Sequence, residues 1–178
     1  TILTSHGPQF LIDLRYVNSN IKSVLLSTTG KSVQYIPLET KSASLLKTIQ
    51  HIELSDSIIF VSDNDKLLKF DTAGRFIKQI GIKGRGPGEY PSIYDFSIDK
   101  TNQLIYIAAS RIKEILIFDF DGNFIKSFKV PYIPIQILVS EMNYILFRNS
   151  FPDPNANYNW YITDNEGNIL SKYWSFPG

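Results

Sequence analysis

Three copies of one local pattern constrain the fold more than any other feature of this sequence. In each copy an apolar run ends in Asp-x-x-Gly, and a second apolar run follows at once. The copies occupy residues 67–78, 115–126 and 160–170. Their turn glycines, Gly74, Gly122 and Gly167, lie 48 and 45 residues apart. Asp can hydrogen-bond to its own turn and Gly tolerates the positive φ of a tight hairpin, so the pattern predicts three regularly spaced β-hairpins.

Two further apolar segments precede each hairpin and complete a period of four strands. They are 49–54 and 58–61, 94–98 and 104–108, and 135–138 and 144–147. A repeat of this length is typical of a four-stranded propeller blade. The sequence shows no convincing helical periodicity. We therefore expect an all-β fold, a β-propeller of which about three four-stranded blades are present, at about 46–80, 93–129 and 134–174.

The region before the repeats divides into an N-terminal segment, 1–32, and a strand at 33–38 that begins the partial propeller of residues 33–178. In closed propellers an early strand often completes the last blade and so removes an exposed sheet edge. We expect the same role for 33–38. Three blades cannot close a ring alone, so either further blades or a second copy of the chain would have to complete it.

The connection after the first hairpin carries a family resemblance. It contains Gly86-Pro87-Gly88-Glu89-Tyr90 and, with the flanking Asp-x-x-Gly-x-Phe hairpins, resembles the linker of NHL-type repeats. More closely, the chain is similar to bacterial six-bladed β-propeller proteins, many of them named as lipoproteins. The resemblance implies a ring of six blades, a periplasmic or cell-surface location, and a membrane link only through a lipid anchor outside this chain.

Composition excludes several classes of function. The 178 residues include no cysteine, so disulfides, thiolate catalysis and cysteine-bound metals are excluded. The formal net charge is +1, which does not favour nucleic acid as a partner. No apolar run approaches the ~18 residues that a membrane helix needs. We expect no cofactor, no metal and no catalytic residue set.

Four local patterns have competing interpretations. The Gly-rich loop at 81–91 could cradle phosphate, but a strand follows it where a phosphate loop needs a helix, so a blade linker is favoured. His6 and His51 lack a nearby carboxylate pattern, which argues against zinc or a histidine base. The periodic aspartates could bind calcium, although turn formation explains every copy. The lysines and arginines of 66–85 could bind nucleic acid or simply line a solvated strand edge.

Loop lengths indicate which rim of the propeller binds a partner. The connections between first and second strands, and between third and fourth strands, are short. Those on the opposite rim, at 81–93, 109–113 and 149–157, are long, and function concentrates in such loops. We predict ligand-binding residues on this rim: Arg85, Glu89, Tyr90, Arg111, Arg148, Tyr158 and Trp160.

A rim that mixes Arg with Tyr and Trp suits a protein or carbohydrate ligand, although several of the aromatic residues would pack between blades instead. The sequence thus predicts a non-catalytic, exported binding or scaffold propeller. The alternative is a propeller hydrolase, lactonase or lyase with its site in the central channel.

Overall fold

A computed structural model describes residues 2–4, 7–9, 32, 34–109, 111–140, 142, 144–149 and 158–175. The chain divides into two compact units, Thr1–Tyr35 and Ile36–Gly178. In the first unit, β1 (Ile2–Thr4) and β2 (Gly7–Gln9) form an antiparallel pair. The second unit contains all three repeats. The described residues include no helix that could span a membrane.

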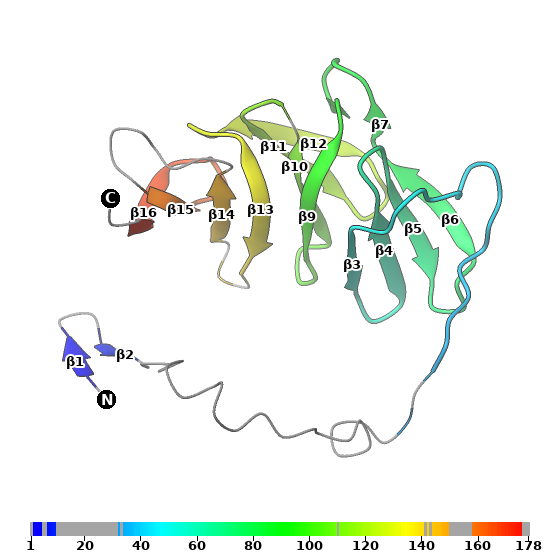
Figure 1. The fold of residues 1–178 in the computed structure, drawn as a ribbon, viewed down its shortest axis with the longest axis horizontal. Coiled ribbons are helices and arrows are strands. Elements are labelled where there is room, and N and C mark those ends of the chain that lie inside the picture. Colours follow the sequence, from blue (N-terminus) through cyan, green and yellow to red (C-terminus); the bar gives the residue numbers. More distant parts are fainter. Residues whose placement is uncertain are drawn as a thin grey trace. The chain divides into compact units, whose positions relative to one another are not determined.

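Each repeat forms one antiparallel four-stranded sheet whose strands follow chain order (Figure 1). The first sheet contains β3 (His51–Leu54), β4 (Ile58–Ser62), β5 (Leu67–Asp71) and β6 (Phe76–Ile80). The second contains β9 (Ile93–Asp99), β10 (Leu104–Ala109), β11 (Glu114–Asp119) and β12 (Phe124–Lys129). The third contains β13 (Pro134–Val139), β14 (Ile145–Asn149), β15 (Tyr158–Thr163) and β16 (Ile169–Ser175).

The repeated aspartates close the turns between the third and fourth strands. Asp71 Oδ1 accepts hydrogen bonds from the backbone N–H groups of Ala73 at 3.0 Å and Arg75 at 2.9 Å. In the other two copies, Asp119 and Asp164 accept equivalent bonds from the residue four positions later, at 2.8 and 2.9 Å. These carboxylates therefore form the turn hydrogen bonds that were predicted for them.

Apolar side chains between neighbouring sheets form the core. The first interface buries Phe60 of the first sheet against Phe96 and Phe118 of the second. The second interface buries Tyr106 and Ile115 of the second sheet against Phe147 and Tyr161 of the third. A fully buried side chain of this size contributes about 1.5–3 kcal/mol relative to an exposed one. Sheet-on-sheet packing is thus the main stabilising contact between repeats.

Equivalent lysines add polar contacts between neighbouring sheets. Lys78 Nζ, on β6, donates to the backbone oxygen of Asp121 at 2.5 Å. At the same position of the next repeat, Lys126 Nζ donates to Glu166 Oε1, also at 2.5 Å. Lys69 is buried and likewise donates to a carbonyl of the second sheet, at 2.7 Å. Part of the basic stretch at 66–85 therefore joins repeats, a role that neither sequence interpretation included.

The segment predicted as a strand at 33–38 forms no strand over the part that the structure describes, and its role in closing the last blade of a ring stays a prediction. Residues 34–38 pair with no strand, and residue 33 lies outside the described residues. The following residue, Glu39, instead contacts the first hairpin: its N–H donates to Gly74 O at 2.8 Å and its Oε2 accepts from Phe76 N–H at 3.0 Å. Leu38 packs against the outer apolar face of the first sheet. Pro37 has no N–H to donate to a neighbouring strand. The segment also crosses over the turn of the first hairpin, whereas an added strand would run along the edge of a sheet.

Candidate functional site

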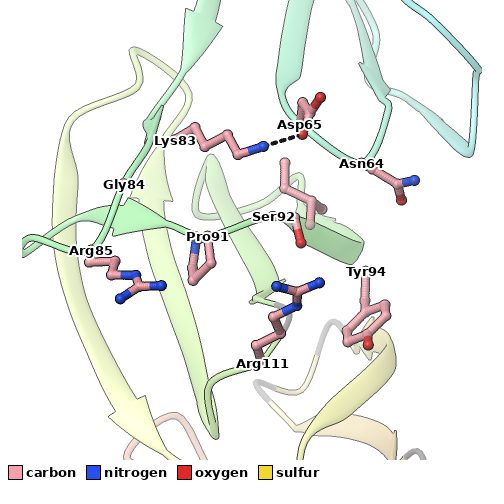
Figure 2. A pocket seen from close by; sticks show the side chains of 10 residues that line it. Asn64, Asp65, Lys83, Gly84, Arg85, Pro91, Ser92, Tyr94 and Arg111 are labelled. Carbon is pink, nitrogen blue, oxygen red and sulfur yellow. Dashed lines mark hydrogen bonds and ion pairs between the residues drawn. The ribbon is translucent and has the colours of Figure 1, made fainter.

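A cavity of about 550 Å³ lies where three connections of the first two sheets meet (Figure 2). They are the β4–β5 connection, the linker between the two sheets, and the β10–β11 connection. This is the rim to which the sequence assigns the long loops, although the β4–β5 connection itself spans only residues 63–66. The cavity is lined by Asn64, Asp65, Lys83, Gly84, Arg85, Pro91, Ser92, Ile93, Tyr94 and Arg111.

Glu89 holds the linker in shape. The linker pairs β7 (Ile82–Lys83) in parallel with β8 (Glu89–Tyr90). Glu89 Oε2 accepts the backbone N–H groups of Arg85 at 2.9 Å and Gly86 at 2.8 Å. A Cβ at Gly84 would lie only 1.9 Å from that oxygen, so a larger residue there would have to displace the Glu89 carboxylate. In a phosphate-binding loop these N–H groups would be free to bind the phosphate. Here the Glu89 carboxylate accepts them, so Glu89 stabilises the loop.

Tyr90 was predicted as a ligand residue, and the structure contradicts a place for it on the surface. Its side chain is fully buried in the interface between the first two sheets. The hydroxyl donates to Ile80 O at 2.8 Å, and burial raises the pKa of Tyr90 to about 12. An aromatic residue at the end of a linker can close the core as readily as it can line a rim, and here it closes the core.

Asp65 gathers two lysines at one side of the cavity. Its two carboxylate oxygens lie 2.8 Å from Lys47 Nζ and 2.5 Å from Lys83 Nζ. The hydrogen bonds from Lys47 and Lys83 lower the pKa of Asp65 to about 2. The carboxylate is therefore ionised at all ordinary pH values, and it directs Lys83 along the wall of the cavity, as Figure 2 shows.

Arg85 and Arg111 stand on either side of Pro91 (Figure 2). Both arginines are exposed, and both also line a neighbouring cavity of about 410 Å³. Arg111 adopts a φ of 62°, in the left-handed region that residues other than glycine, asparagine and aspartate seldom adopt. Such a conformation is held in place by its surroundings and is more frequent at functional sites than elsewhere. These are the two predicted ligand residues that the structure brings together.

The other three predicted residues lie on the third sheet and line neither cavity. Arg148 Nε donates to Gln136 Oε1 at 2.6 Å, and Arg148 faces Trp160 across the β14–β15 ladder. Tyr158 packs against the core between the second and third sheets. The connection at 150–157, which the prediction included in the same rim, lies outside the described residues.

A second polar cluster joins the first strands of the three sheets. His51 Nδ1, on β3, makes a short contact with Asp95 Oδ1, on β9, and His51 Nε2 lies 4.0 Å from Glu53 Oε1. The same carboxylates bind the next sheet along: Glu53 Oε2 accepts from Ile98 N–H at 3.2 Å, and Asp95 Oδ2 accepts from Ile137 N–H at 3.0 Å. All three charged side chains are half-buried.

The surroundings of His51 shift two pKa values in the same direction. The hydrogen bond to Asp95 raises the pKa of His51, and burial raises the pKa of Glu53. The expectation that His51 has no carboxylate nearby is therefore wrong. Asp95 lies 44 residues further along the chain and meets His51 only because the first strands adjoin. Among the described residues, no group of three or more acidic or histidine side chains is placed to hold a metal ion.

Comparison with solved structures establishes the fold class. The chain is similar to a "Putative exported protein (BF0058)" from Bacteroides fragilis, with a TM-score of 0.73 and 23% identity over 82% of this chain and 43% of that one. It also resembles the WD40 domain of Neurospora crassa Pan2, with a TM-score of 0.53 and 15% identity over 71% and 36% of the two chains. Saccharomyces cerevisiae Sqt1 gives a TM-score of 0.50 and 14% identity over 65% and 31%.

Because WD40 repeats form propeller blades, the predicted all-β, propeller-type fold is confirmed. The chain spans less than half the length of each of these three proteins. No curated protein matches it. A family model does match, over residues 9–177, which is nearly the whole sequence. The chain belongs to the family described as "Domain of unknown function (DUF4934)".

Proposed function

We propose that this chain is part of an exported binding propeller that recognises a protein or carbohydrate partner through the cavity between its first two sheets. The observation that carries the proposal is the cavity itself. Its volume of about 550 Å³ lies within the range of small-ligand sites, roughly 300–1,000 Å³. Its wall comes from three connections on two rigid sheets, the usual arrangement for a binding site on a scaffold.

Export is supported by the name of the Bacteroides fragilis protein that this chain resembles. The six-bladed ring, the NHL-like repeat and the lipid anchor belong to the same proposal. The ring is supported by the three sheets described here and by the 43% share of the Bacteroides protein that the chain covers. A structure of a longer protein containing this chain would test the ring, and a blade number other than six would refute it.

Binding through this rim is tested with a panel of glycans and secreted proteins on the immobilised chain. Arg111→Asn changes the cavity wall, and asparagine tolerates the positive φ at this position. Lys100→Gln removes one charge from a cavity on the opposite rim and is the matched control. We expect a partner whose binding weakens in Arg111→Asn and is unchanged in Lys100→Gln. Binding that weakens in Lys100→Gln and is unchanged in Arg111→Asn would place the binding face on the other rim.

The cluster around His51 favours a second candidate function, that of a hydrolase, lactonase or lyase. A histidine whose Nδ1 is paired with a carboxylate is oriented as a general base, with Nε2 as the reacting atom. Glu53 lies 4.0 Å from that atom and could act as a proton donor while its carboxyl group is protonated. Product formation from ester, lactone or polysaccharide substrates that disappears in His51→Gln would support the enzyme. Absence of turnover with all three substrate classes would count against the enzyme and favour the binding function.

A further inference from the structure

The cavity between the first two sheets has more positive than negative charge. Three of the side chains that line it are cationic, Lys83, Arg85 and Arg111, and one is a carboxylate, Asp65. Asp65 is already neutralised by two lysines, one of them outside the lining, at 2.8 and 2.5 Å. Its charge therefore does not offset the two arginines.

No carboxylate among the described residues forms an ion pair with Arg85 or Arg111. The neighbouring acid, Glu89, has its Oε2 bound to two backbone N–H groups of the linker. Two exposed guanidinium groups thus flank a single proline at the cavity wall (Figure 2). Each guanidinium carries planar donors that match the two oxygens of a carboxylate, and a ligand with such a group would supply the missing negative charge.

The rest of the wall fits a sugar ring better than an extended acidic peptide. Tyr94 is 43% exposed and Pro91 lies between the arginines, so both offer flat apolar surfaces. Asn64 adds an amide that can exchange hydrogen bonds with hydroxyl groups. The concave shape accommodates one or two rings, whereas protein partners usually need a flatter and larger contact.

We propose that this cavity binds an acidic sugar residue of a polysaccharide, with Arg85 and Arg111 donating to its carboxylate and Tyr94 packing against its ring. The inference rests on the proposed binding function and specifies the ligand of that same site. Salt bridges at an exposed rim are screened by salt, so binding should weaken as ionic strength rises.

The test compares each acidic glycan with its own carboxyl-reduced form. Oligogalacturonate, alginate and hyaluronan oligosaccharides are titrated calorimetrically into the chain, each beside the neutral glycan made from it. We expect at least one acid form to bind about tenfold or more tightly than its reduced counterpart, because a hydrogen bond to a charged group is worth roughly that factor. Equal affinity for the two forms of every pair would overturn the inference.

Variants then locate the charge effect. The double variant Arg85→Gln with Arg111→Asn should lose the preference for the acid form. Lys113→Gln should retain the preference, because Lys113 is exposed, follows Arg111 closely and lines neither cavity. Circular dichroism confirms folding of each variant. A preference that survives the double variant would also overturn the inference.

A poly-glutamate peptide and a neutral glycan distinguish failure of the inference from failure of the proposed function. If either binds through the rim while no acidic glycan does, the rim still binds a partner and only the ligand class is wrong. If no probe binds and rim variants change nothing, both the inference and the proposed function fail.

Discussion

Replacing the turn glycines by alanine, one at a time, would show through the loss of unfolding free energy what packs against each hairpin. Gly74 and Gly122 occupy the same place in the repeat, with φ values of 81° and 79°. Their surroundings differ. A Cβ at Gly74 would lie 2.1 Å from Pro37 O, whereas a Cβ at Gly122 would have Ile80 Cδ1, at 3.2 Å, as its nearest atom and no backbone atom closer than 3.7 Å. Alanine therefore imposes the same backbone strain at both positions and a backbone clash at one.

The expected losses follow from these contacts. A left-handed φ costs alanine about 1–2 kcal/mol, and the reduced entropy of the unfolded chain returns about 0.4–1 kcal/mol. Gly122→Ala should therefore destabilise the chain by about 1 kcal/mol. In Gly74→Ala the Pro37 carbonyl must move, and the two Glu39 hydrogen bonds to the hairpin are lost, at about 1 kcal/mol each. The total for Gly74→Ala is about 3 kcal/mol.

Urea unfolding followed by circular dichroism measures the difference. With a slope of about 2 kcal/mol per molar urea, the midpoints should fall by about 0.5 M for Gly122→Ala and about 1.5 M for Gly74→Ala. Deleting the Glu39 carboxylate contact, as Glu39→Ala with Gly74→Ala, should then add little to the larger loss. Equal midpoint shifts for the two glycine variants would show that residues 36–39 do not lie on the first hairpin.

Three further predictions concern side chains away from the hairpins. Because pairing with Asp95 raises the pKa of His51 in the folded state, its contribution to stability is complete below the unfolded value of about 6.5 and is lost as pH rises through the folded pKa. His51→Gln should remove that part of the decline in unfolding free energy as pH rises above about 6.5; an unchanged profile would contradict the pairing. Tyr90→Phe leaves Ile80 O without its buried donor and should cost about 1–3 kcal/mol, measured by urea unfolding; a loss near zero would mean that water replaces the hydroxyl. Glu89→Ala removes the oxygen that accepts the N–H groups of Arg85 and Gly86 and should speed amide exchange at 85–86, and unchanged exchange there would contradict its role in the linker.

The fold could be predicted from sequence because its signals are local. Each Asp-x-x-Gly copy forms its own turn, so the hairpins at Gly74, Gly122 and Gly167 need no distant partner. The period then predicts the sheets. The segment at 34–38 shows the limit of this reasoning, because a strand also needs a neighbour to pair with. The position of this segment depends on the hydrogen bonds of Glu39 and on the open space beside a glycine. Neither can be recognised from a local sequence pattern.

The candidate site was predictable only in part, because it depends on which side chains the rim leaves exposed. Arg85 and Arg111 are charged residues in irregular loops, so exposure followed from their type and position. Tyr90 belongs to the same linker, yet its ring fills the core, a difference that arises from packing between sheets. The pair of His51 with Asp95 depends on contact between two first strands and could not be read from either strand alone.

Hydrogen exchange with and without a bound partner would locate the binding face on the propeller. The partner is whichever glycan or protein from the panel binds the chain. We expect slower amide exchange at 63–66, 83–94 and 111–113, the connections that surround the cavity. Slower exchange confined to the opposite rim, at 55–58, 100–103 and 119–123, would contradict this location.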